Sequence, residues 1–245
     1  MSRSIVVIFT AVLLSAFCLA QSPLEQIWRR ATARPVSGLA DDKITAGLRE
    51  ALKVSTTKAV ATTGRPDGFL KNETIKILLP QKLRNARTGL SMIGMGPQLE
   101  ELEVGMNRAA EQAAPEAKQI FLNALMQMSI NDARGILSGN DTAATDYFRG
   151  KSSADLATAF KPIVHRSLQN VGVVQQYEQL TQNSLATPLL RNQKFDLDDY
   201  VVGKALDGLF YMLGQEEKQI RRNPTAQTSA ILKEVFGSHP QPTGR

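Results

Sequence analysis

Proline and glycine divide this chain into segments in which apolar side chains recur at helical spacing. In residues 41–63, for example, Ile44, Leu48 and Leu52 follow one another at the four-residue spacing of a helix that buries one face. Gly64 comes next, and glycine commonly ends helices because it tolerates a left-handed backbone conformation. Alternating runs of β-branched residues, which are typical of strands, are scarce. The pattern therefore predicts an all-α protein.

The helix signals continue along the chain and predict a single multi-helix domain of roughly eight to ten helices. Besides the first helix, we expect helices over residues 83–93, 97–113, 115–128, 129–139, 175–185, 196–222 and 224–236, one beginning near residue 140 and a longer one beginning at residue 152 or 153. Pro162 should kink that longer helix.

Between the first two helices, residues 65–68 have the composition of a turn, because proline fixes one backbone angle and glycine permits the opposite sign. At most a short extended segment is expected, near Ile75–Leu79.

The first twenty residues predict where the protein works. Arg3 is followed by an almost wholly apolar stretch over residues 5–17 and by small residues around Ala20, which is the order of a secretory signal peptide. The apolar stretch is shorter than a membrane-spanning helix. We expect cleavage near Ala20 and a periplasmic or secreted protein without a transmembrane segment. A lipoprotein anchored through Cys18 is the less favoured alternative, because Phe17 is too large for that processing site.

These signals divide the chain into four parts. They are a signal peptide (residues 1–20), an N-terminal arm (21–38), an all-helical domain (39–237) and a disordered tail (238–245).

The composition argues against several classes of function. The formal charge of +6 is modest and scattered, so no nucleic-acid binding is expected. The single cysteine, Cys18, lies in the signal peptide, so the mature chain would hold neither a disulfide nor a zinc–thiolate site. The two histidines do not form the Glu-x-x-His pairs of a di-metal helical site. We therefore expect no metal and no cofactor.

Several short stretches resemble one bacterial family. They are residues 46–52 (AGLREAL), 67–69 (DGF), 107–111 (NRAAE), 132–137 (DARGIL), 143–148 (AATDYF), 205–210 (ALDGLF) and 216–221 (EEKQIR), the last followed by Pro224. In this order they resemble the family known as domain of unknown function 4197, over about residues 39–237. The resemblance implies an all-helical secreted domain. The family carries no established activity, so the resemblance transfers no catalytic residue.

One set of polar residues is placed where polar groups are costly: Asn107, Arg108, Glu111, Asp207, Glu216, Glu217 and Arg221. Asp207 is the only charged residue in the otherwise apolar run 205–213, so we expect it to be buried. Arg108 is its expected partner, with Asn107 or Glu111 completing the hydrogen bonds. We favour a structural network over a ligand site, because ion-pair networks often have no other role.

Two functions follow from these residues. The favoured one is a non-enzymatic binding or structural protein of the cell envelope, whose partner is a protein, an envelope component or a small molecule. The alternative is a hydrolase that uses Glu111 and Asp207 as paired carboxylates in a polar pocket. The sequence shows no nucleophile, metal set or oxyanion device for such an enzyme. Whether the polar side chains open onto a pocket or are sealed in the core would discriminate between a ligand site and a structural network.

Overall fold

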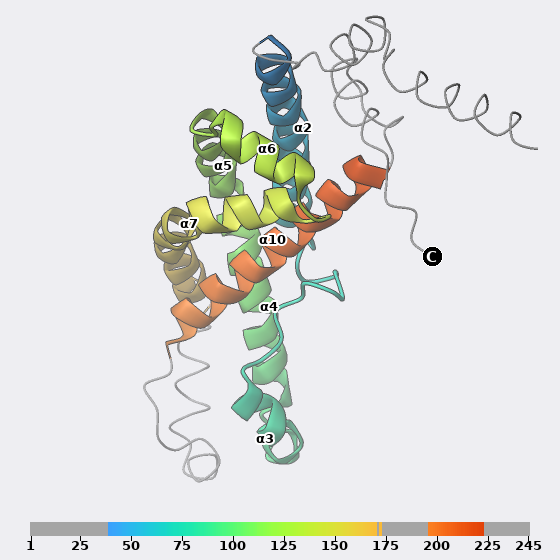
Figure 1. Cartoon of the computed structure of the whole chain (residues 1–245). Helices are drawn as coiled ribbons and strands as arrows, with labels where there is room; N and C mark the ends of the chain where they lie inside the picture. Colours follow the sequence, from blue (N-terminus) through green and yellow to red (C-terminus); the bar gives the residue numbers. More distant parts are fainter. Residues whose placement is uncertain (1–38, 171, 173–195, 223–245) are drawn as a thin grey trace, which may run out of the picture. The chain divides into compact units, whose positions relative to one another are not determined.

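The computed structural model describes residues 39–170, residue 172 and residues 196–222 (Figure 1). The chain divides into two compact units, Met1–Asp41 and Asp42–Arg245. Of the first unit only its last three residues are described, at the start of a helix. The arrangement below is that of the second unit.

Several predicted parts lie outside the described residues. They are the signal peptide, the N-terminal arm, the two helices predicted over 175–185 and 224–236, and the C-terminal tail.

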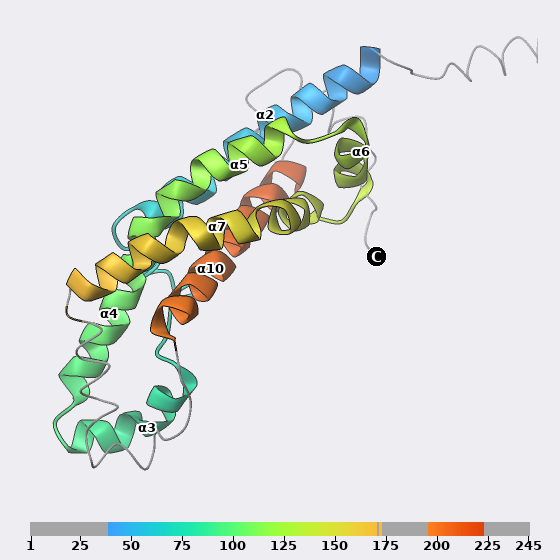
Figure 2. The same ribbon diagram turned by 90° about the vertical axis from the view of Figure 1, so that its left-hand side faces the viewer.

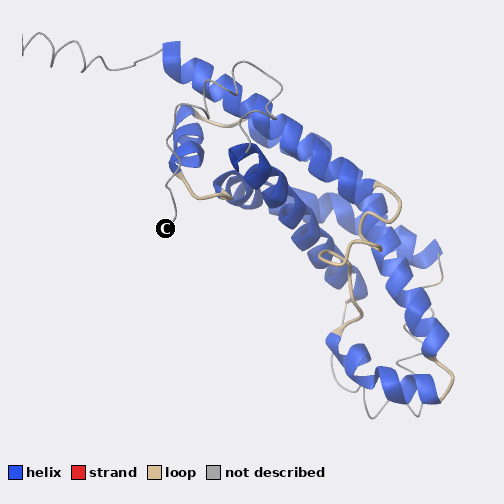
Figure 3. Cartoon of the chain, turned by 90° about the vertical axis from the view of Figure 1, so that its right-hand side faces the viewer, coloured by secondary structure: helices blue, strands red, loops and turns tan. Residues whose placement is uncertain are grey.

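The regular secondary structure of the described residues is helical, and these residues contain no strand (Figure 3). The elements are α2 (Leu39–Gly64), α3 (Gln81–Met92), α4 (Gly96–Ala113), the 3₁₀ turn η1 (Ala114–Glu116), α5 (Ala117–Met126), α6 (Ile130–Ser138), α7 (Ala143–Asn170) and α10 (Leu197–Arg222). The all-α prediction is confirmed, but the described ranges do not support the predicted count of eight to ten helices. None of these helices is long and apolar enough to cross a membrane.

Local signals place most helix ends where the sequence predicts them. α4 begins with Pro97 in its first turn, where the missing N–H of proline breaks no helical hydrogen bond. α6 begins with a capping box in which Ser129 and Asp132 each bind the other's backbone N–H. At the start of α10, the Asp196 carboxylate accepts a hydrogen bond of 3.0 Å from the Asp199 N–H.

α7 corrects the prediction of two helices in this region. A single helix runs from Ala143 to Asn170, with Ser152 inside it rather than at its start. Ser152 is buried, and Phe148 and Leu156 are buried one turn before and after it, so packing of this face continues the helix past the predicted break. Pro162 is also inside the helix and is exposed.

α7 packs against α4, α5, α6 and α10. Figure 2 shows α7 between α5 and α10. At the centre, the rings of Phe121 on α5 and Phe148 on α7 meet edge to face at 5.1 Å, and Phe121 meets Phe210 on α10 at 6.0 Å. All three rings are fully buried, so they join three helices into one core.

The segment between α2 and α3 is irregular, as predicted, and its burial alternates. Asp67 adopts a φ of 65°, in the predicted turn. Further on, Ile75, Ile77 and Leu79 are buried whereas Leu78 is 43% exposed. From Ile77 to Leu79 the alternation is that of an extended backbone, whose successive side chains point to opposite sides, whereas Ile75 ends a turn in which its N–H donates to the Asn72 carbonyl.

Candidate functional site

The seven predicted site residues do not form one network. The structure places Asn107 below the extended segment, Arg108 and Glu111 at the turn that precedes it, Glu216, Glu217 and Arg221 near the end of α10, and Asp207 in a groove along α10.

Asn107 fixes the extended segment on α4. Its side-chain oxygen accepts a 2.8 Å hydrogen bond from the Ile77 N–H, and its amide nitrogen donates to the Ile77 carbonyl, also at 2.8 Å. The same nitrogen donates to the Glu103 carbonyl at 2.8 Å. Asn107 is completely buried. Its side chain makes the two backbone hydrogen bonds that a neighbouring strand would otherwise make with Ile77, so the buried N–H and carbonyl of Ile77 both have partners.

Glu111 holds the turn. One carboxylate oxygen accepts hydrogen bonds of 3.1 Å from the backbone N–H groups of Phe69 and Leu70. The other oxygen accepts a 2.6 Å bond from Arg108, which also donates to Asp67 at 2.7 Å. We call Asp67, Arg108 and Glu111 the turn clamp.

The charges of the turn clamp stabilise one another. Hydrogen bonds to Glu111 and Asp67 raise the pKa of the Arg108 guanidinium. Hydrogen bonds from Lys71 and Arg108 lower the pKa of the Asp67 carboxyl below its ordinary value of 3.8. Sequence reasoning did not place Asp67 in the site, although the turn composition of residues 65–68 was a signal for it.

Asp207 is not buried, and its predicted pairing with Arg108 is wrong. Its side chain is 63% exposed and lies 3.4 Å from Lys204 and 3.9 Å from Arg149. The run 205–213 looks apolar all round because it also carries partly exposed apolar side chains such as Tyr211, which do not face the core. Counting apolar residues therefore overestimated how much of this helix is buried.

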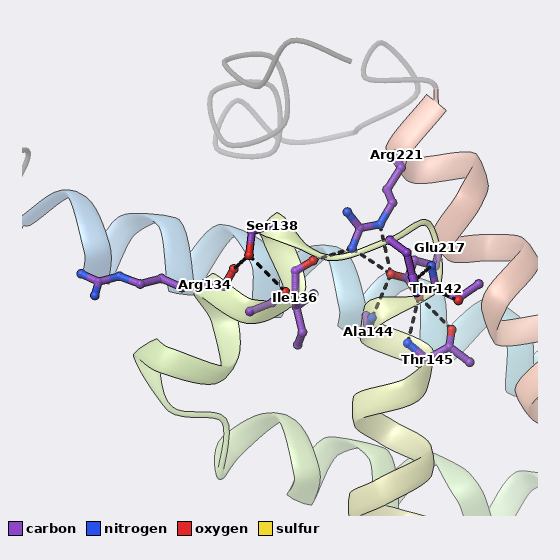
Figure 4. Close-up of polar contacts among 10 residues, drawn as sticks. Arg134, Ile136, Ser138, Thr142, Ala144, Thr145, Glu217 and Arg221 are labelled. Atoms are coloured by element: carbon purple, nitrogen blue, oxygen red, sulfur yellow. Dashed lines mark hydrogen bonds and ion pairs between the residues drawn. The ribbon is translucent and has the colours of Figure 1, made fainter. Parts of the chain in front are cut away.

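Glu217 caps α7 from the neighbouring helix α10 (Figure 4). Its carboxylate accepts 2.9 Å hydrogen bonds from the N–H groups of Ala144 and Thr145, in the first turn of α7. Arg221 donates to the same carboxylate at 2.9 Å and to the Ile136 carbonyl at 2.7 Å. A buried carboxylate at the positive end of a helix, paired with a cation, is a stabilising arrangement. Glu216 points elsewhere and lies 3.6 Å from Lys58.

Members of the predicted set line three cavities. Arg108 and Glu111 line one of about 330 Å³, beside Gly64 and Pro115, whereas Asp207 lines one of about 400 Å³. Glu217 and Arg221 line the third, whose volume is only about 10 Å³. Glu111 and Asp207 therefore do not form the carboxylate pair of the hydrolase alternative. In the described ranges, no three His, Cys, Asp or Glu side chains are grouped to hold a metal ion.

The largest of these three cavities lies between residues 74–84 and α10, and we call it the α10 groove. Tyr200 on α10 donates a 2.8 Å hydrogen bond to the Leu78 carbonyl, which ties the two sides together, and burial raises the pKa of this phenol. At the groove floor, a Cβ on Gly208 would lie only 2.5 Å from the buried Phe69 ring and 3.2 Å from the Ile75 Cβ. Only glycine permits this close approach. The groove is thus a preformed feature.

The sequence pattern of a family described as protein of unknown function (DUF4197) matches residues 38–237. The chain belongs to the DUF4197 family. This confirms the resemblance seen in the sequence motifs. No curated protein and no solved structure matches the chain.

In this DUF4197 protein, the polar residues singled out from the sequence mostly serve the fold. Asn107, Glu111 and Glu217 each bind backbone groups of another segment. The α10 groove instead combines cations, phenols and apolar side chains around open space. Arg84, Lys204, Tyr200 and Tyr211 of this groove were missed, because charged and aromatic residues on helix surfaces carry no local signal that they share a cavity.

Proposed function

We propose that this DUF4197 protein is a non-enzymatic binding protein of the cell envelope, which is exported to the periplasm and holds its ligand in the α10 groove. The observation that carries the proposal is the groove itself. It has a volume of about 400 Å³, within the usual range of small-molecule sites, and its lining includes the exposed apolar side chains Leu78 and Tyr211.

The distribution of polar groups supports binding rather than catalysis. The buried carboxylates of Glu111 and Glu217 accept backbone hydrogen bonds and pair with arginines, which leaves them no role as acids or bases. The groove contributes a single carboxylate, Asp207, which lies near two cations. Such a site can hold and orient a ligand, and its described lining offers no second carboxylate for a paired-carboxylate mechanism.

Binding can be tested with the protein purified from the periplasm. Native mass spectrometry should show a co-purified small molecule, and adding that molecule back should raise the melting temperature. Tyr211→Ser should reduce this shift, since it removes an apolar wall of the groove. Met126→Ser is the matched control, because Met126 is 70% exposed on α5 and does not line the groove. Equal shifts in the melting temperature of wild type, Tyr211→Ser and Met126→Ser would contradict binding in the groove.

Export rests on residues 1–20, whose order of charged, apolar and small residues is that of a signal peptide. The family match covers residues 38–237 and does not include this segment. N-terminal sequencing of the periplasmic protein should give a start near Gln21. Incorporation of a labelled fatty acid at Cys18 would show a lipoprotein instead.

A further inference from the structure

We infer that the ligand of the α10 groove is a small amphipathic anion, with a carboxylate, phosphate or sulfonate-like head bound by Arg84 and Lys204 and an apolar body packed on Leu78 and Tyr211. This inference rests on the proposed binding function of the groove and names the class of its ligand.

The cationic side chains that line the groove differ in how strongly carboxylates of the protein neutralise them. Lys76 is neutralised by Glu103 at 2.7 Å. Lys204 reaches Asp207 only at 3.4 Å, and both side chains are largely exposed, so this pair is weak. Arg84 donates to the neutral amide oxygen of Gln81, and no carboxylate of the described residues lies within ion-pair distance of it. Arg84 therefore presents an uncompensated charge to the groove.

The guanidinium of Arg84 suits an anionic group in particular. Its planar array of N–H donors can bind two oxygens of a carboxylate or phosphate at once, which gives shorter and stronger hydrogen bonds than a neutral ligand would accept. Arg84 and Lys204 line the same cavity from α3 and α10, on opposite walls of the groove. An anion held between them would join these two helices.

The apolar part of the groove indicates that the ligand is more than a free inorganic anion. Leu78 and Tyr211 are 43% and 44% exposed, and both line the cavity, with buried Ile75 at its floor. The extended backbone directs Ile77 and Leu79 into the core, so Leu78 points away from it. The Tyr200 bond to the Leu78 carbonyl holds this wall in place without a ligand. Covering exposed apolar groups is favourable for a ligand with an apolar body.

The carboxylate of Asp207 would repel an anionic ligand. Removing its charge therefore provides a second test, in which the affinity should change in the opposite direction. Asp207 lies 3.4 Å from Lys204 and 3.9 Å from Arg149, whose guanidinium also stacks 4.5 Å from the centre of the Phe210 ring. An anionic ligand at Lys204 has to compete with this carboxylate and is repelled by it. Removing the charge of Asp207 should therefore tighten anion binding, whereas removing the charge of Arg84 should weaken it.

The test compares two fluorescent probes, 8-anilinonaphthalene-1-sulfonate and N-phenyl-1-naphthylamine, which share the aromatic body but differ in the sulfonate. Arg84→Gln should weaken binding of the sulfonate probe by roughly tenfold or more, the usual effect of losing a charge-assisted hydrogen bond. Asp207→Asn should tighten it several-fold, in the range of an exposed charge interaction. Binding of the uncharged probe should change little in both variants.

Arg87→Gln is the matched control, since it makes the same substitution one turn further along α3 and outside the cavity lining. Equal affinities of Arg84→Gln and wild type for the sulfonate probe would overturn the anion inference. If Tyr211→Ser then still weakens both probes, the groove binds ligands of another class and the proposed function stands. If Tyr211→Ser changes neither probe, the groove is not the binding site and both proposals fail.

Discussion

Asp67 combines an unusual backbone conformation with two ion pairs of its side-chain carboxylate. A φ of 65° is unusual for a residue with a side chain, although aspartate and asparagine tolerate it better than most. Asp67 remains in this conformation while it pairs with Lys71 at 2.8 Å and Arg108 at 2.7 Å. The turn clamp thus ties a locally strained backbone to α4.

Asp67→Asn should separate charge from backbone conformation, because asparagine also accepts a positive φ. The folded-state pKa of Asp67 is lowered, so its stabilisation is present above the unfolded value of 3.8 and is lost as the pH falls through the folded value. The variant should be less stable than wild type at pH 7, and this difference should shrink as the pH falls below 3.8. Urea unfolding at a series of pH values from 7 to 3 measures it. Asp155→Asn, which makes the same substitution at an exposed position of α7, is the matched control.

Glu111 is the residue of the turn clamp on which stability depends most. Glu111→Ala would leave two backbone N–H groups and the Arg108 guanidinium without their acceptor. We expect a loss of about 2–4 kcal/mol in the free energy of unfolding, the usual result of removing one partner from a buried polar network. Glu100→Ala on the exposed face of the same helix should change this free energy by less than about 0.5 kcal/mol. Similar losses in both variants would contradict the clamp.

At the scale of elements, glycine decides how closely α10 approaches the segment between α2 and α3. The Phe69 ring occupies the space in which a side chain at position 208 would begin. Phe69 is fully buried and its backbone is held by Glu111, so it has no room to retreat. The turn clamp and the floor of the α10 groove are therefore mechanically connected through Phe69.

Two glycine substitutions on α10 should have effects of opposite sign. Gly208→Ala should destabilise the protein by about 1–3 kcal/mol, because the added methyl group would overlap the Phe69 ring. Gly203→Ala meets no atom within 4 Å and should stabilise the helix by about 0.5–1 kcal/mol. Thermal and urea unfolding of both variants measures the contrast. A stabilised Gly208→Ala protein would show that the contact with Phe69 is not tight.

At the scale of the whole molecule, the described helices share one apolar core, and α7 lies at its centre. The buried polar groups are distributed around this core rather than gathered at one point. Each of Asn107, Glu111 and Glu217 attaches one segment to another by accepting backbone N–H bonds. Such contacts select one arrangement of the helices among those that would bury a similar apolar area.

Substitutions of Phe121 test whether this core unfolds as one cooperative unit. Phe121→Ala removes the ring that contacts both Phe148 and Phe210, and we expect a loss of about 3–5 kcal/mol. Phe121→Leu keeps most of the volume and should lose less. A single unfolding transition, with coincident circular dichroism and fluorescence curves, is expected in both variants. Separate transitions would mean that α5 is not part of the same cooperative core.

The helix positions were predictable because their signals are local. Pro97 in the first turn of α4, the Ser129–Asp132 capping box and Asp196 before α10 each act within a few residues, so the sequence alone determines them. Burial of Asn107, Glu111 and Glu217 was also within reach, since polar residues in apolar surroundings need partners.

Only the tertiary structure decided which residues those partners are. Arg108 pairs with Asp67 rather than with Asp207, and α7 continues through Ser152 because its buried face continues. The α10 groove likewise depends on where α3 and α10 lie relative to residues 74–84. Local propensity acts over one or two helical turns, whereas these contacts join residues that are far apart in the chain. Their energies depend on how the helices pack, which periodicity and caps do not encode.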